Sequence, residues 1–194
     1  MKKVAQSSLG TVISSTWNNK TGNLVAVGVN GDSTWEIDLN DNKLTHVQVI
    51  SEPVQEVLGL QSSNIVSVGN RYLVLWNTSQ TPYSEEKRVE TNESIIGLFT
   101  NDDLVAYITQ SSNIVLVDVK TFKELYRLKH ESVSHVTFAP QASTMISSSR
   151  DGNLMHWNTE TGQLEKVVLC ADILSEYVDI SCVEYDPTGQ YLAI

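Results

Sequence analysis

The residue types of a serine hydrolase occur together in one short part of the sequence. His130, Ser147, Ser149 and Asp151 lie within residues 130–151, and Trp157 follows them. In a Ser-His-Asp arrangement the histidine removes the proton of the serine hydroxyl, and the aspartate orients the histidine ring. The sequence has no Gly-x-Ser-x-Gly pattern, which places the nucleophile on a sharp turn in many hydrolases. These residues are therefore candidates for catalysis that lack the surrounding motif.

Metal and phosphate chemistry would need spacings that the sequence does not contain. No two of the histidines form a His-x-His or His-x₃-His pair: they are His46, His130, His135 and His156. Two cysteines, Cys170 and Cys182, are too few for a four-cysteine zinc site or a disulfide framework, and we interpret them as reduced thiols. Gly28 and Gly31 belong to no phosphate-binding glycine pattern. We therefore expect no metal site and no cofactor.

The composition is that of a folded, acidic chain. Of 194 residues, 41% are hydrophobic and 19% are charged, with 10 glycines and 4 prolines, which excludes the collagen-like and disordered classes. Thirteen Lys and Arg against 23 Asp and Glu give a net charge of −10, which disfavours binding to nucleic acid. The apolar stretches are too short to span a membrane, and the residues after Lys2 and Lys3 form no hydrophobic signal segment. We expect an intracellular protein, nuclear or cytoplasmic.

A repeat positions the candidate residues. Four stretches share a polar turn, alternating residues and a large apolar residue followed by Asp or Asn; they are residues 30–38, 70–77, 111–118 and 150–158. Their last residues, Asp38, Asn77, Asp118 and Asn158, are 39, 41 and 40 residues apart. A repeat period of this length is typical of stacked supersecondary units.

Each interval contains further strand signals. β-Rich runs precede the terminal pairs at residues 24–29, 65–68, 104–108 and 145–149. Strands that end in an aromatic residue or Leu come before those runs, at residues 12–17, 54–60, 95–99 and 133–138. No window of comparable length shows a helical period. Four-stranded antiparallel units that repeat about every 40 residues predict an all-β fold made of β-propeller blades.

The fourth unit resembles the WD-repeat (WD40) β-propeller family. Residues 129–130 stand where the family has Gly-His, residues 133–140 match the first strand and its turn, and residues 149–158 match the turn and the third strand that ends in Trp-Asp. A fifth unit begins at residues 180–194. The first and third units have Ile37 and Val117 in place of the signature Trp, and the resemblance carries strong information on fold and little on function.

The resemblance implies a partial propeller. We expect one WD-repeat domain over residues 1–194, with blades at about 8–50, 51–91, 92–128 and 129–170 and an incomplete blade at 171–194. About four and a half blades would then be present, as part of a propeller of about seven, with the remainder beyond residue 194. Residues 3–7 are a candidate for the strand that closes the last blade. A half-propeller that dimerises, or one completed by a partner strand, is the alternative.

The resemblance also implies a structural role for the hydrolase-like residues. In WD-repeat proteins such a histidine bridges a turn aspartate and a strand hydroxyl, which in turn reaches the indole N–H. We expect His130, Ser147, Ser149, Asp151 and Trp157 to form a network of this kind, because a buried indole and a buried imidazole both need partners.

The candidate binding residues lie in turns and connections. In this family the turns between second and third strands share one face with the inter-blade connections, and that face commonly binds peptides. Mapped onto the sequence, the face carries Arg71, Arg150, Glu52, Glu93 and Glu131. Arginine grips carboxylates and phosphates, so an acidic or phosphorylated peptide is a candidate ligand, and an ordinary solvated rim is the alternative.

Two segments depart from the repeat and are further candidates. Residues 80–92 form a polar stretch that we interpret as a connection between blades. Residues 169–178 lengthen another interval, and Leu174, Tyr177 and Val178 would form an apolar patch there if they are exposed. A fourth strand and its corner are an equally good interpretation of the second segment.

These observations favour a non-catalytic scaffold that binds partner peptides within an intracellular multiprotein complex. A propeller with nucleic-acid contacts in a ribonucleoprotein or chromatin complex is the first alternative, and the net charge disfavours it. An enzyme with its site in the propeller channel is less favoured, because the expected inner strands at residues 54–60 and 95–99 are mostly apolar.

Overall fold

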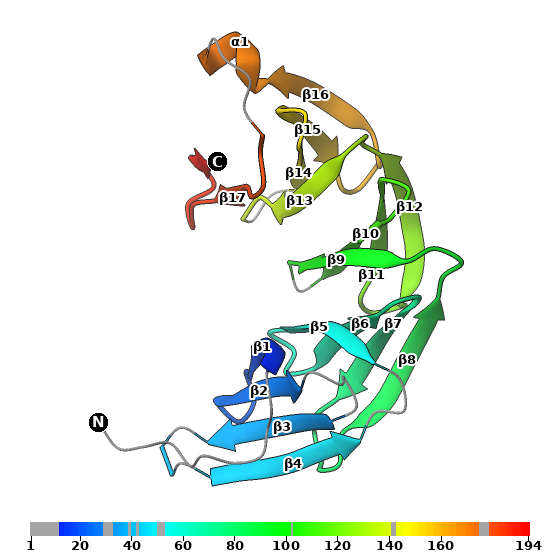
Figure 1. Cartoon of the computed structure of the whole chain (residues 1–194), viewed down its shortest axis with the longest axis vertical. Coiled ribbons are helices and arrows are strands. Elements are labelled where there is room, and N and C mark those ends of the chain that lie inside the picture. Colours follow the sequence, from blue (N-terminus) through cyan, green and yellow to red (C-terminus); the bar gives the residue numbers. More distant parts are fainter. Residues whose placement is uncertain are drawn as a thin grey trace. The chain divides into compact units, whose positions relative to one another are not determined.

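The computed structural model describes residues 12–28, 33–38, 40–41, 43–49, 53–101, 103–140, 143–174 and 179–194. The candidate closing strand at residues 3–7 lies outside them. Four four-stranded antiparallel sheets contain most of the described strands, and the described helical content is one short segment (Figure 1). The prediction of an all-β chain built from four-stranded, blade-like units is confirmed.

Each sheet is formed by consecutive strands. The first contains β1 (Val12–Asn18), β2 (Asn23–Gly28), β3 (Ser33–Asp38) and β4 (Lys43–Val49). The second contains β5 (Val54–Gly59), β6 (Ile65–Gly69), β7 (Tyr72–Asn77) and β8 (Ser84–Glu90). The third contains β9 (Ile95–Thr100), β10 (Leu104–Thr109), β11 (Asn113–Asp118) and β12 (Lys123–Lys129). The fourth contains β13 (Val133–Phe138), β14 (Thr144–Ser149), β15 (Asn153–Asn158) and β16 (Leu164–Leu169).

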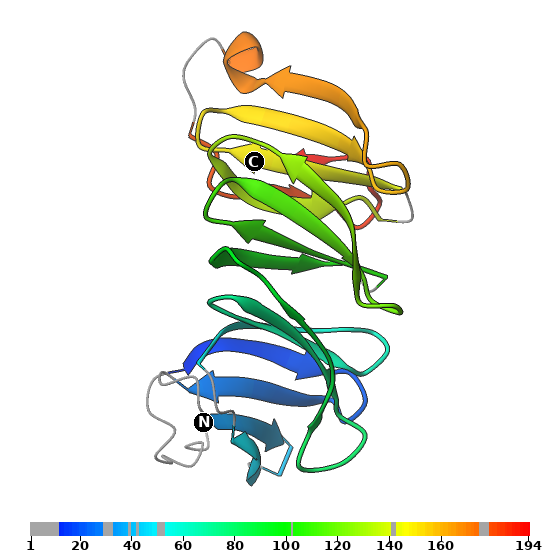
Figure 2. The same ribbon diagram turned by 90° about the vertical axis from the view of Figure 1, so that its right-hand side faces the viewer.

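The strands follow one another in space as they do in the sequence. Neighbouring strands pair in chain order within each four-stranded sheet, so each sheet is an antiparallel meander (Figures 1 and 2). In the fourth sheet, Met145 on β14 lies opposite Trp157 on β15. The expected fifth unit contributes a two-stranded sheet of β17 (Glu184–Tyr185) and β18 (Leu192–Ala193).

The chain divides into two compact units, residues 1–98 and 99–194. The first contains the first two sheets and the beginning of β9. Its described core consists of Val25, Val27, Val54, Val57, Ile65, Tyr72, Val74, Trp76 and Tyr83. A core cluster of the second unit consists of Ala106, Ile108, Ile114, Leu116, Leu128, Val133, Val136, Met145 and Trp157. A further cluster contains Ile146, Leu154, Cys170, Ile180 and Val183.

In the second sheet, the inner strand β6 and the outer strand β8 differ in burial. This difference explains one error of the sequence interpretation. Every residue of β6 is buried, whereas the residues of β8 are exposed or half-buried. Residues 80–92 were interpreted as a connection because residues 84–90 show no apolar alternation, but they contain β8, the fourth strand of its sheet. β8 is the last strand of its sheet and is largely exposed, and an edge strand tolerates polar and charged side chains.

Of the segment at residues 169–178, the structure describes residues 169–174. β16 ends at Leu169, and α1 (Cys170–Leu174) follows it at once. The fourth strand therefore precedes this segment, and residues 170–174 are helical instead of extended. Among the described residues, no helix is long and apolar enough to cross a membrane.

Candidate functional site

Ser147 links His130 and Trp157 within the second unit. The indole Nε1–H of Trp157 donates a 2.8 Å hydrogen bond to Ser147 Oγ, which lies 2.7 Å from His130 Nδ1. Because Ser147 Oγ accepts from the indole, its own proton is available to the imidazole nitrogen. His130 directly follows β12, Ser147 lies on β14 and Trp157 lies on β15, and all three side chains are buried.

The second ring nitrogen of His130 has no partner. Nε2 is buried without a hydrogen bond, and it carries the ring proton if Nδ1 accepts from Ser147. Burial lowers the pKa of His130, while the negative charges of Asp151 and Glu131 act in the opposite direction. Burial therefore disfavours the charged imidazole, and the neutral ring can accept a hydrogen bond from the serine hydroxyl through Nδ1.

Ser149 is the last residue of β14, and Asp151 lies in the turn between β14 and β15. The backbone N–H of Asn153 donates to Ser149 Oγ at 3.2 Å, and the serine hydroxyl faces the Asn153 carbonyl at 3.5 Å. Asp151 is exposed in the same turn, where Gly152 adopts a φ of 79°. The structure thus brings together His130, Ser147 and Trp157, and it places Ser149 and Asp151 outside their hydrogen bonds.

The arrangement offers no route for hydrolysis as it stands. Ser147 has no exposed surface, and a nucleophile must reach the carbonyl of its substrate. What the arrangement does is satisfy a buried indole donor. A second instance occurs in the second sheet, where Trp76 Nε1–H donates to Ser67 Oγ at 2.8 Å. Ser67 was missed in the sequence, although it precedes its Trp by nine residues and Ser147 precedes its own by ten.

A buried polar network in the first unit was also missed. Glu36 on β3 is 8% exposed, and its carboxylate accepts a 3.0 Å hydrogen bond from the Tyr83 hydroxyl and a 3.1 Å one from Asn23 Nδ2. The hydroxyl of Thr21 donates to the same carboxylate. Asn18 Nδ2 donates to the oxygen of Tyr83 at 3.0 Å. Burial raises the pKa of Tyr83, so the phenol stays protonated and serves as a donor.

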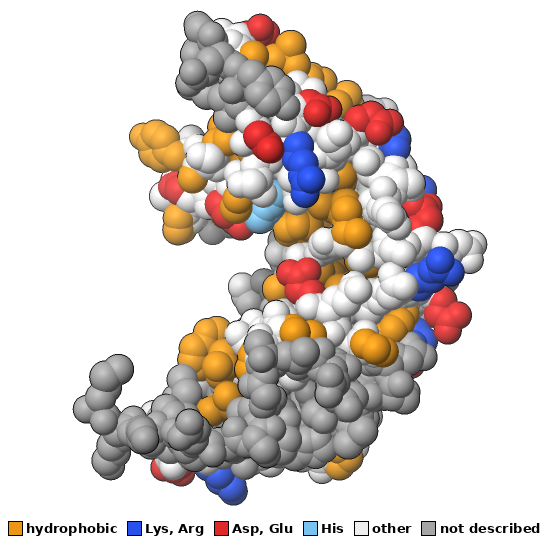
Figure 3. All heavy atoms as spheres, viewed as in Figure 1, with side chains coloured by type: hydrophobic (Ala, Val, Ile, Leu, Met, Phe, Trp, Pro, Cys, Tyr) orange, Lys and Arg blue, Asp and Glu red, His pale blue; other side chains and the backbone are white. Residues whose placement is uncertain are grey.

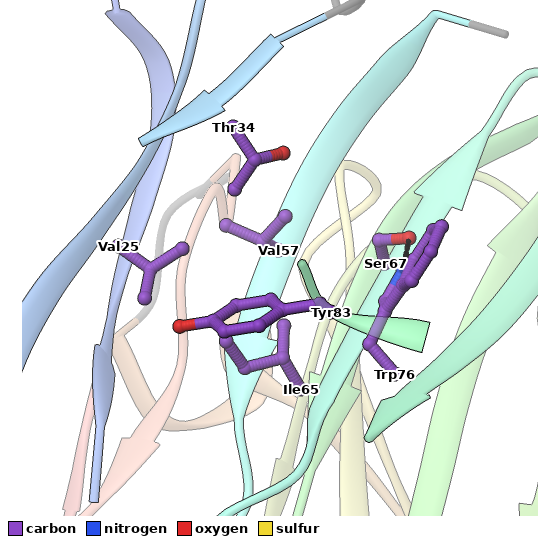
Figure 4. Close-up of a pocket in the computed structure, with 7 residues that line it drawn as sticks. All are labelled: Val25, Thr34, Val57, Ile65, Ser67, Trp76 and Tyr83. Atoms are coloured by element: carbon purple, nitrogen blue, oxygen red, sulfur yellow. Dashed lines mark hydrogen bonds between the residues drawn. The ribbon is translucent and has the colours of Figure 1, made fainter. Parts of the chain in front are cut away.

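Tyr83 connects the first two sheets. Figure 4 shows its ring beside Ile65, with the hydroxyl pointing toward Val25 on β2 and with the bonded Ser67 and Trp76 on the other side. These residues line a cavity of about 10 Å³ together with Val57 and Thr34, which is about the space that one water molecule needs. The network and its cavity are therefore parts of a packed interface between sheets, and they leave no room for an organic ligand.

Backbone hydrogen bonds join the turns and connections in which the candidate binding residues lie. In the first unit, Thr91 N–H donates to the Arg71 carbonyl at 2.9 Å, and Ile95 N–H donates to the Asn70 carbonyl at 2.8 Å. In the second unit, Arg150 N–H donates to the Ser132 carbonyl at 3.1 Å. The turn between β6 and β7 is thus bonded to the connection that follows β8, and the turn between β14 and β15 is bonded to the connection that precedes β13. We call these bonded turns and connections the rim.

Four of the candidate binding residues lie on the rim. Arg71, Arg150 and Glu131 are exposed and Glu93 is half-buried. Glu131 pairs with Lys129 Nζ at 3.3 Å and precedes Ser132, the residue bonded to Arg150. Within the second unit, Glu131 and Arg150 therefore belong to the same edge. Glu52 and Tyr177 lie outside the described residues, and the side chain of Leu174 lies outside them too.

The remaining described histidines do not form a metal centre. His135 Nε2 lies 3.8 Å from Glu184 Oε1, and its ring centroid lies 4.7 Å from that of Phe99. Burial lowers the pKa of His135 and of His156. In the parts of the chain that the structure describes, no three His, Cys, Asp or Glu side chains are placed to hold one metal ion.

Comparison with known families agrees with this architecture. Residues 122–158 match the family model for the WD domain, G-beta repeat. The matched residues run from the start of β12 to the end of β15 and include His130, Ser147 and Trp157. The resemblance to the WD-repeat family is therefore confirmed for this repeat. A search of curated proteins found no match.

Proposed function

We propose that this protein is a non-catalytic interaction scaffold that binds partner peptides within an intracellular multiprotein complex. WD40 repeats in general mediate binding to other proteins, and residues 122–158 match that repeat. The observation that carries the proposal is the rim, where backbone hydrogen bonds fix charged residues such as Arg71 and Arg150 at exposed positions. A fixed backbone lowers the entropy cost of holding such side chains for a partner.

The proposed partners are peptide segments with acidic or phosphorylated residues. A guanidinium group binds a carboxylate or a phosphate through two parallel hydrogen bonds. Arg71 supplies such a group on the first unit and Arg150 supplies one on the second. Glu131 and Glu93 would select against peptides that carry an acidic residue at the wrong position.

Absence of catalysis is part of the proposal, and the burial of Ser147 supports it. Ser147 accepts the hydrogen bond of the Trp157 indole instead, and His130 is bonded to the same hydroxyl. We place the protein in the nucleus or the cytoplasm, and the two free cysteines, Cys170 and Cys182, are compatible with a reducing compartment.

Charge reversal on the rim tests the proposal. The full-length protein carrying Arg71→Glu and Arg150→Glu would be purified from its native cells next to the wild type, and co-purifying proteins would be quantified by mass spectrometry. Lys123→Glu is the matched control, because Lys123 is exposed at the opposite end of β12 from Glu131. We expect the double variant to lose at least one partner that the control retains. Retention of every partner by the double variant would contradict the proposed surface.

A further inference from the structure

An open groove of about 460 Å³ lies where three first strands begin in the first unit. This volume is within the usual range for ligand-binding pockets. Its lining residues come from the starts of β1, β5 and β9 and from β6; they are Ile13, Ser14, Gln55, Glu56, Val68, Ile95, Ile96 and Gly97. The groove is distinct from the turn that carries Arg71. One residue of its wall, Ile95, is nevertheless joined to the rim by the backbone hydrogen bond from Ile95 N–H to the Asn70 carbonyl.

Side chains of β1 hold β1 against β5 and define one end of the groove. Ser14 Oγ accepts a 3.1 Å hydrogen bond from Val57 N–H, and Thr16 Oγ1 accepts a 2.7 Å one from Gly59 N–H. A side chain at Gly59 would not fit, because its Cβ would lie 2.3 Å from the Trp17 carbonyl oxygen. The strands are therefore closest at the Gly59 end, and the groove opens at the end where Ile13 and Glu56 lie.

The walls of the groove combine polar and apolar side chains, and two of the apolar ones are exposed. Ile13 is 42% exposed and Ile96 is 61% exposed, and Val12 beside them is 43% exposed. Hydrophobic side chains are visible at the surface of the first unit in Figure 3. Exposed aliphatic residues from neighbouring strands, gathered around one opening, are typical of a site that binds an apolar segment of a partner.

Glu56 is the one titratable residue among those that line the groove. Its carboxylate accepts a hydrogen bond from the backbone N–H of Leu98, and burial raises its pKa. Burial removes part of the water that would otherwise solvate this carboxylate. A bound cation would stabilise the charged form in place of that water. The net charge of −10 also attracts basic segments to the protein.

We propose that this groove binds an arginine side chain of a partner peptide, with apolar residues on either side of that arginine. The guanidinium group pairs with the Glu56 carboxylate, and the Ser14 hydroxyl and the Gln55 amide oxygen, which line the same groove, are candidate acceptors for its other donors. The flanking apolar residues pack on Ile13 and Ile96. The inference rests on the proposed scaffold function, and it assigns to the first unit a partner chemistry opposite to that of the arginines on the rim.

Peptide pools with a fixed central residue test this inference. Five nonapeptide pools would carry Arg, Lys, Glu, phosphoserine or Ala at the centre and mixed Ala, Leu, Ile and Ser elsewhere, and their retention on the immobilised full chain would be measured. We expect the arginine pool to be retained about tenfold more strongly than the alanine pool. We expect Glu56→Gln to remove this preference and Glu90→Gln, an exposed change on β8, to preserve it.

The variant is designed to fold. A glutamine at position 56 has the same shape and still offers an oxygen to Leu98 N–H, and circular dichroism would verify the fold. Equal retention of all pools, a preference for phosphoserine, or an arginine preference that survives Glu56→Gln would overturn the inference. So would a dimer of the chain that Glu56→Gln dissociates, because the occupant would then be a second copy. If the pools show no preference while native partners still co-purify, the groove assignment fails and the scaffold function stands.

Discussion

The hydroxyl of Tyr83 donates a 3.0 Å hydrogen bond to the carboxylate of Glu36, although 47 residues separate them in the sequence. Tyr83 precedes β8 of the second sheet, and Glu36 lies on β3 of the first. Both residues are buried, at 5% and 8% exposure, so the hydrogen bond is shielded from water. A charge-assisted bond at such a position ties the two sheets together through a polar contact inside an otherwise apolar interface.

Tyr83→Phe should therefore destabilise the first unit. The substitution removes one donor to the buried Glu36 carboxylate and the acceptor for Asn18 Nδ2, so we expect a loss of about 1.5 to 3 kcal/mol in the free energy of unfolding. Urea denaturation followed by circular dichroism measures it. Tyr191→Phe is the control, because Tyr191 is 72% exposed and should change stability by less than about 0.5 kcal/mol. Equal effects of the two substitutions would contradict the role of Tyr83.

Ser147→Ala should destabilise the second unit more than Ser149→Ala. The first change leaves the Trp157 indole N–H without its acceptor and His130 Nδ1 without its donor, which should cost at least about 2 kcal/mol. Ser149 bonds the backbone of Asn153 alone among the described contacts, and its loss should cost less than about 1 kcal/mol. Urea titrations of both variants provide the comparison. A larger effect of Ser149→Ala would mean that the central hydroxyl of the network has been assigned wrongly.

The stability of the second unit should fall in mild acid. Burial lowers the pKa of His130 in the folded protein below its usual value of 6.5. As the pH falls below about 6.5, the unfolded chain takes up this proton before the folded one does, so the free energy of unfolding decreases. Urea titrations between pH 7.5 and 5 should show this decrease.

His130→Asn is the matched variant for this pH dependence. An amide does not titrate in this range, so the variant should show a shallower decrease than the wild type. Some decrease should remain, because burial also lowers the pKa of His135 and of His156. An unchanged pH dependence in the variant would show that His130 is not held neutral by the fold.

Glu56→Gln should have the opposite dependence on pH. Burial raises the pKa of Glu56 above 4.5, so its contribution to stability is present in acid and is lost as the pH rises through the folded pKa. We therefore expect the variant to be more stable than the wild type at pH 7, with a difference that shrinks as the pH falls toward 4.5. Thermal unfolding at the two pH values measures this. A variant that is less stable than the wild type at both pH values would contradict the conclusion that burial destabilises the ionised Glu56 carboxylate.

The local parts of the architecture could be predicted from the sequence. Trp157 and Ser147 belong to a pattern that recurs about every 40 residues, and such a pattern needs no knowledge of distant contacts. The strand at residues 84–90 was missed because all its residues except Val89 are polar or charged, as is possible for a strand at the edge of its sheet. Alternation of apolar residues detects strands with one buried face, and β8 lacks that signal.

The long-range parts of the site could not be predicted in this way. Glu36 meets Tyr83 because two sheets pack against each other, and no spacing in the sequence encodes that contact. The groove around Glu56 depends on the close approach of β1 and β5 at Gly59, which becomes apparent only in three dimensions. Asp151 shows the reverse case, since the resemblance to the WD-repeat family implies a bond from it to the histidine and the structure leaves His130 Nε2 without a hydrogen bond.

The most direct test of the scaffold function is native mass spectrometry of the full-length protein purified from its own cells at moderate salt. The account predicts a reproducible complex in which the protein is present in fixed stoichiometry with other proteins. It also predicts that the Arg71→Glu and Arg150→Glu variant loses part of that complex while remaining folded. A protein that is recovered alone, with a tightly bound metal ion or small molecule, would contradict the account and indicate a catalytic role.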